Sequence, residues 1–141
     1  MEDPRRRQRE GEEPFDPIQE SETAAGQPTS QQKADVLAAE LLRIHEESYG
    51  RAAERAITHF VDDTLIVLME GLELLPNEQF LIDNGQADTV AHVRSQYQKA
   101  IEPTFRAAVE RATGRRVKGF SSHVHLGDDP FTAEIFRLEP E

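Results

Sequence analysis

Apolar side chains recur at helical spacing in two long stretches of the chain. In the first, from Ser30 or Gln31 to Tyr49, one stripe holds Leu37, Leu41 and Ile44, and polar residues fill the other positions. Gly50 is a suitable stop for this helix. The second helix is expected to be capped by Asp88 or Thr89 and has apolar positions at Val90, Val93, Tyr97, Ile101, Phe105, Ala108 and Ala112.

Pro103 lies inside the second helical pattern. Proline lacks an N–H donor and clashes with the preceding turn, so it should kink this helix or divide it in two. Gly114 is expected to end the helix.

Two segments have the alternation and turn chemistry of β-hairpins. The first consists of residues 56–61 and 64–70, with Asp62-Asp63 as a two-residue turn. Its second strand is apolar at every position from Leu65 to Met69, which predicts a central strand covered on both faces. The closing hairpin starts after Gly114, turns at Gly127-Asp128-Asp129 and returns through residues 131–138.

A short helix is predicted over residues 76–84, between the first hairpin and the second long helix. Pro76 suits its first turn, Gly85 suits a position just past its end, and Phe80, Leu81 and Ile82 should be partly buried. The major elements thus follow the order α-β-β-α-β-β. The predicted fold class is α+β, a two-layer domain in which a four-stranded antiparallel sheet carries its helices on one face.

Such a sheet leaves one face without helices. Ile66 or Leu65 with its alternates, together with residues of the closing hairpin, would lie on that face. A homodimer would bury them, since large apolar patches are rare on monomers. The alternative is that the short helix at 76–84 covers this face.

Composition divides the chain into an acidic tail and one domain. Residues 1–31 hold four of the eight prolines, eight acidic and four basic residues, and almost no large apolar side chain, so we expect disorder there and a single domain over 32–141. The net charge of -11 disfavours nucleic acid and anionic lipid as partners. The chain has no cysteine, no run long enough for a membrane helix and no secretory signal, which predicts a cytoplasmic protein that does not insert into the membrane.

The order of features resembles one known family. Its features here are the first hairpin ending in Glu70-Gly71, the segment Leu-Leu-Pro-Asn-Glu-Gln-Phe-Leu81, the long helix with Arg94, Tyr97 and Pro103, the Thr113-Gly114-Arg115 helix end, and the closing hairpin. Over roughly residues 33–138 the chain is similar to the MpsC-like family of bacteria, named for a Na+-translocating, membrane-potential-generating system. The resemblance implies a small accessory protein associated with a cation- or inorganic-carbon-transporting membrane complex. It transfers no catalytic residue.

His123 and His125 are the strongest candidates for chemistry. Two residues apart on one strand, they project from the same face about 7 Å from each other. A divalent transition metal could bind there with a third ligand such as His59, Glu134 or Asp128. The alternatives are exposed histidines on a sheet face and a pH-sensitive interface.

The remaining candidates have structural explanations. Arg115 and Arg116, with Arg111 and Lys118, could bind an anion or an acidic partner, but cations at a helix end also complement its dipole. Ser121 shares a face with His123, yet no oxyanion site accompanies them, so a hydrolase is not supported. The Asp62-Asp63 and Asp128-Asp129 pairs are explained by turn chemistry.

The sequence therefore favours a non-enzymatic, homodimeric interaction protein with a membrane-transporter protein as its partner. A small-ligand or metal-binding module that uses His123 and His125 is the alternative. The sequence contains no recognisable catalytic signature, so it does not support an enzymatic function.

Overall fold

The computed structural model describes residues 29–50 and 53–141, and the compact unit begins at Ala34. The disordered tail predicted for residues 1–31 falls almost wholly outside the described residues. Its last two positions, Ser30 and Gln31, belong to the first helix instead. Thr29 caps that helix, because its hydroxyl accepts from the Gln32 N–H at 3.0 Å and its own N–H donates to Gln32 Oε1 at 2.7 Å.

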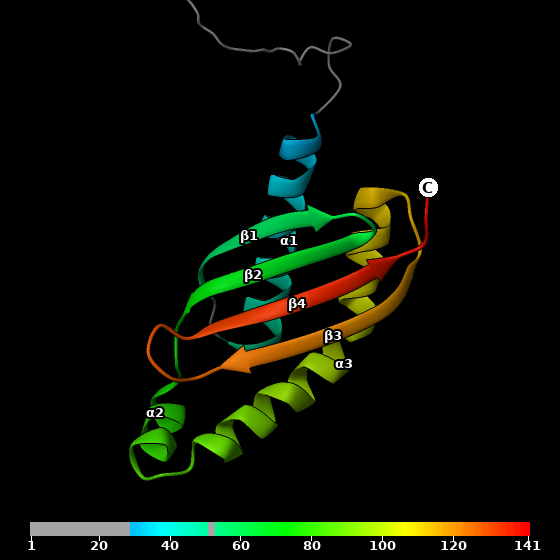
Figure 1. Ribbon diagram of the computed structural model, residues 1–141. Helices are drawn as coiled ribbons and strands as arrows, with labels where there is room; N and C mark the ends of the chain where they lie inside the picture. The colour runs from blue at the N-terminus through cyan, green and yellow to red at the C-terminus, as the bar shows by residue number, and fades with distance from the viewer. Residues whose placement is uncertain (1–28, 51–52) are drawn as a thin grey trace, which may run out of the picture. The chain divides into compact units, whose positions relative to one another are not determined.

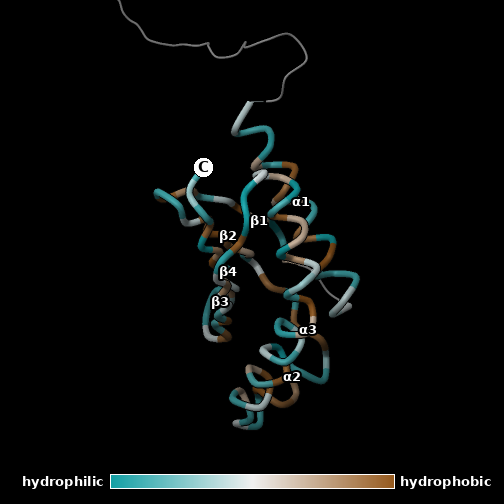
Figure 2. Tube along the Cα trace, turned by 90° about the vertical axis from the view of Figure 1, so that its right-hand side faces the viewer, coloured by the Kyte–Doolittle hydropathy of each residue, from teal (hydrophilic) through white to brown (hydrophobic). Residues whose placement is uncertain are grey.

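The predicted α+β fold class is confirmed. In the described residues the order is α1 (Ser30–Tyr49), β1 (Ala53–Val61), β2 (Thr64–Leu72), α2 (Pro76–Asp83), α3 (Ala87–Thr113), β3 (Val117–His125) and β4 (Phe131–Leu138). The strands form one antiparallel sheet in the order β1-β2-β4-β3. Figure 1 shows this sheet in front of α1 and α3, and Figure 2 shows from the side that both helices lie on the same face.

Alternate strand positions are buried against the helices. On β2 these are Leu65, Val67 and Met69, each with no exposed surface. Apolar residues of α1 and α3 complete the core, including Leu37, Leu41, Ile44, Phe105, Ala108 and Val109. The core thus forms where the helical stripes meet one face of the sheet.

The helix α3 stays one element through Pro103. Figure 1 shows that it changes direction partway along its length, where its colour passes from green to yellow. The predicted kink is therefore present and the division in two is not. Gly114 ends the helix in the left-handed conformation, with φ 69°, as its position predicted.

Two local predictions need correction, and one open alternative is decided. α3 begins at Ala87 with Gln86 as its cap, so Asp88 lies in the first turn, where a carboxylate complements the helix dipole. Phe80 is 66% exposed, and the buried residue of α2 is Glu78. Of Ile66 and Leu65, the two alternatives for the uncovered face, Ile66 lies on that face and Leu65 faces the helices.

Candidate functional site

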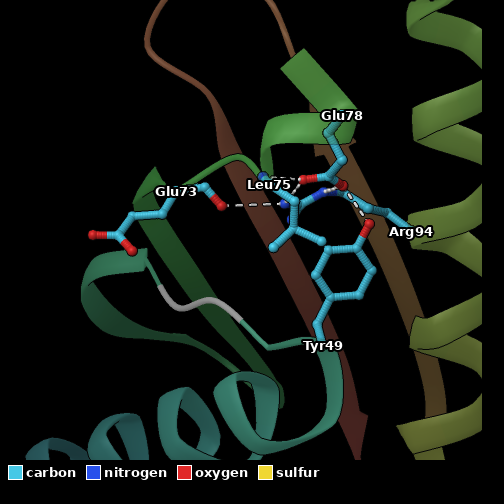
Figure 3. Close-up of polar contacts among 5 residues, drawn as sticks. All are labelled: Tyr49, Glu73, Leu75, Glu78 and Arg94. Carbon is cyan, nitrogen blue, oxygen red and sulfur yellow. Dashed lines mark hydrogen bonds and ion pairs between the residues drawn. The ribbon is translucent and has the colours of Figure 1, made fainter. Parts of the chain in front are cut away.

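The first polar cluster joins the end of α1 to α2 and α3, and we name it the Arg94 cluster: Tyr49, Glu78 and Arg94, with His45 and Tyr97 around them. Arg94 donates to the Glu78 carboxylate through Nε at 2.8 Å and through a terminal nitrogen at 2.9 Å. The Tyr49 hydroxyl and the Leu75 N–H donate to the same carboxylate. Figure 3 shows these groups converging on Glu78.

Aromatic rings close the Arg94 cluster. The Arg94 guanidinium lies 4.4 Å from the centre of the Tyr49 ring, and Tyr97 meets that ring edge-on. Burial alone would raise the pKa of Glu78, but the bonds from Arg94, Tyr49 and the Leu75 N–H lower it. A carboxylate with this many donors is a poor base, so the Arg94 cluster holds α2 in place and is not suited to proton transfer.

Two buried titratable groups lack such partners. The carboxylate of Glu134 is fully buried on β4, and within residues 29–50 and 53–141 neither oxygen has a partner with hydrogen-bonding geometry. Burial raises its pKa to about 7, which the cross-strand neighbour Ser122 offsets only in part. On α1, burial and then the charge of Arg94 lower the pKa of His45 to about 4. With a pKa of about 7, the Glu134 carboxyl is mostly protonated below pH 7 and about half protonated near pH 7, whereas His45 is neutral there.

The other face of the sheet has no helix over it in the described part of the chain, as Figure 2 shows. We name it the open face. The register of the strands assigns to it Arg55, Ile57, His59, Val61, Thr64, Ile66, Leu68, Glu70, Gly119, Ser121, His123, His125, Phe131, Ala133, Ile135 and Arg137. The helix α2 packs on α3 instead, so the short helix does not provide the predicted cover.

The open face combines an apolar centre with a basic border. Ile66, Leu68 and Ile135 lie half-buried on its two inner strands, while Arg137 and the histidines are exposed. Among the open-face residues Glu70 is the one acid, and Arg55 pairs with it at 2.8 Å. This face is thus an exception in a chain whose net charge is -11.

The candidate residues from the sequence are divided between two regions. Ser121, His123 and His125 are exposed on the open face along the edge strand β3. Arg115 is instead committed to the fold, since it pairs with Asp63 of the first hairpin turn at 2.5 Å and donates to the Glu139 carbonyl at 2.9 Å. Arg116 is exposed beside it.

The third ligands considered for a metal do not meet the two histidines. Glu134 points to the helices, on the opposite face of the sheet from His123. His59 is on β1 and three strand spacings away, or about 14 Å. In the described residues no three His, Asp or Glu side chains gather as a metal ion needs, so metal binding by His123 and His125 stays a prediction.

Sequence reasoning did not find the Arg94 cluster or the burial of Glu134. The alternation on β4 was a usable signal, because Glu134 shares its face with Phe136 and Leu138. Within the Arg94 cluster, Tyr49, Glu78 and Arg94 are 16 to 45 positions apart in the chain, and no local pattern predicts such a contact.

The comparisons with known proteins give one result. A family model described as "Na+-translocating membrane potential-generating system (MpsC)" matches residues 29–139. The chain belongs to the MpsC family. No curated protein and no solved structure matches it.

Membership in the MpsC family confirms the resemblance predicted from the sequence and associates the chain with a system that generates a membrane potential. Within residues 29–50 and 53–141, no helix has both the length and the apolar character to cross a bilayer.

Proposed function

We propose that this MpsC protein is a non-enzymatic accessory protein of a Na+-translocating system, and that its open face binds a protein component of that system. The observation that carries the proposal is the open face itself, where Ile66, Leu68 and Ile135 remain half-buried with no helix over them. Apolar side chains of this size on an uncovered sheet favour contact with another protein.

The charge of the open face indicates the chemistry of the partner. Arg137 and the three histidines border the apolar centre, and Glu70 is already paired with Arg55. The matching surface is an apolar patch bordered by Asp and Glu residues. We place the encounter on the cytoplasmic side of the membrane.

The inaccessibility of the buried polar groups also favours a binding role over an enzymatic one. The Glu78 carboxylate is fully engaged in the Arg94 cluster, and Glu134 and His45 are sealed inside the core. Substrates could not reach these groups without opening the domain. The exposed chemistry that remains is that of a contact surface.

The test is an add-back experiment with membrane vesicles from cells that lack this protein. A potential-sensitive dye reports the Na+-driven membrane potential after addition of wild-type protein, Ile66→Glu or Arg137→Glu. Ala107→Glu places the same new charge on an exposed position of α3 and is the matched control. Circular dichroism checks that each variant is folded.

We expect wild type and Ala107→Glu to raise the potential and both open-face variants to fail. Because Arg137 is exposed, its substitution should leave the fold intact even if Ile66→Glu does not. Equal activity of Arg137→Glu, folded Ile66→Glu and wild type would refute the proposal.

A further inference from the structure

The two edges of the sheet differ in how well they are protected against pairing with another strand. At one edge, β3 carries Lys118, serines and histidines, and a register shift between Val117 and Gly119 marks a bulge. Bulges, charges and polar side chains are common devices that keep sheet edges from pairing. At the other edge, the pairing of β1 with β2 is regular from Arg55 to Val61.

The β1 edge is also the more apolar of the two. Ile57, Phe60 and Val61 are large apolar residues with 36%, 49% and 56% of their surface exposed. Beside them, Asp35, Ala38, Ala39, Leu42 and Ala56 line a depression of about 240 Å³ between α1 and β1. This edge therefore offers both a free strand and a place for an apolar side chain.

The hairpin turn determines which backbone groups of β1 point outward. Val61 and Thr64 flank the two-residue turn and form a hydrogen-bonded pair, so the odd-numbered residues of β1 bond to β2. The N–H and C=O groups of Thr58 and Phe60 then point away from β2. An added antiparallel strand must bond to these two residues.

We propose that β1 pairs with β1 of a second copy of this chain, antiparallel and centred on His59. This register places Ile57 opposite the second copy's Val61 and Phe60 opposite its Thr58. The Phe60 ring is then one diagonal step from Ala56 of the other copy, within reach of the depression beside it. Every exposed apolar residue of β1 gains a partner.

Charge disfavours the neighbouring register. A shift by two residues, centred on Thr58, would place Glu54 opposite Asp62, two like charges. The register centred on His59 brings no two like charges opposite each other along β1. A second copy therefore fits this edge in shape, and repulsion between like charges disfavours the alternative register.

The pairing closes at two copies because each copy has one such edge. The two-fold axis runs perpendicular to the sheet, so both open faces lie on the same side of an eight-stranded sheet. This dimer leaves the open face uncovered, unlike the homodimer expected from the sequence. It would stand even if the accessory role proposed above were wrong.

Single cysteines test this pairing directly, because the chain has none of its own. His59 and its copy would form a non-hydrogen-bonded pair with Cα atoms about 4.5 Å apart, inside the range for a disulfide. His59→Cys should therefore form a covalent dimer on mild oxidation. His123→Cys makes the same substitution on the same face at the β3 edge and should stay monomeric on denaturing gels.

The register has its own test. Ile57→Cys and Val61→Cys should cross-link when mixed, and each alone should do so much less. In sedimentation experiments the wild type should be a dimer, and Thr58→Pro a folded monomer, because the Thr58 N–H is not used by β2. Equal cross-linking of His59→Cys and His123→Cys, or a monomeric wild type at every concentration, would overturn the proposal.

Discussion

The two faces of the sheet are built from the same strands, yet they use their residues in opposite ways. Facing the helices, Phe136 and Glu134 are completely buried, and the Glu134 carboxylate has no hydrogen-bond partner among the described residues. On the open face, Ile135 is half-buried, and the Glu70 carboxylate forms an ion pair with Arg55 Nε at 2.8 Å. The packing that stabilises the domain is therefore concentrated on the helix-facing side, while in the described residues no helix covers the open face.

Neighbouring residues on β4 should show the largest contrast. Phe136→Ala removes a sealed aromatic ring, and we expect it to lower the free energy of unfolding by about 3–5 kcal/mol. Ile135→Ala, one position away on the open face, should cost only about 1 kcal/mol. Urea unfolding followed by circular dichroism measures both, and equal losses would show that the open face is as tightly packed as the core.

Removal of one partner should lower the free energy of unfolding much more for a buried ion pair than for an exposed one. Arg94→Met leaves the Glu78 carboxylate buried without its main partner and should cost about 3–5 kcal/mol. Arg55→Met breaks the Arg55–Glu70 pair at the sheet surface and should cost at most about 1 kcal/mol. A double-mutant cycle of Arg94→Met with Glu78→Gln should show strong coupling, and additive effects would contradict the role assigned to the Arg94 cluster.

Glu134 and His45 should give opposite pH dependences of stability. The pKa of Glu134 is raised from 4.5 to about 7, so its contribution is complete below pH 4.5 and is lost as the pH rises to about 7. The pKa of His45 is lowered from 6.5 to about 4, so its contribution is complete above pH 6.5 and is lost as the pH falls to about 4. Each shift corresponds to about 3 kcal/mol, and the two effects largely cancel in the wild type.

Two variants should each show one of these pH dependences of stability without the other. In Glu134→Gln, stability should rise with pH between about 4 and 6.5 because the effect of His45 is left, and in His45→Gln it should fall between 4.5 and about 7. Urea midpoints measured at half-unit pH steps provide the test. Parallel profiles for the two variants would mean that burial does not control these groups.

Arg137→Glu should have the smallest effect on stability. Its side chain is exposed on the open face, so we expect a change within about 0.5 kcal/mol. The same variant should nevertheless fail to support the Na+-driven potential. Stability loss together with activity loss would place Arg137 in the fold rather than in the interface.

Local patterns in the sequence were sufficient for most of the fold. Pro76, the Asp62-Asp63 turn and Gly114 act through their own backbone geometry, and each appears where it was expected. The Arg94 cluster depends on three segments that meet only after folding. No periodicity within one segment can predict that Tyr49 and Arg94 will share the Glu78 carboxylate.

The candidate site was predictable only in part. Alternation placed Ser121, His123 and His125 on one face, which agrees with the structure. The same alternation on β4 places Glu134 with Phe136 and Leu138, but it could not show that the buried carboxylate would lack a hydrogen-bond partner among the described residues. The pairing of Arg115 with Asp63 spans 52 positions and also lay beyond any local signal.

The most direct test of the central claim asks whether the open face is covered when the protein binds its system. Ser121→Cys and Ser95→Cys place single exposed thiols on the open face and on α3. Alkylation rates are compared for free protein and for protein bound to vesicles that carry the Na+-translocating membrane components. We predict that binding slows alkylation at position 121 at least tenfold and leaves position 95 unchanged. Unchanged alkylation at position 121 in the bound protein would contradict the account.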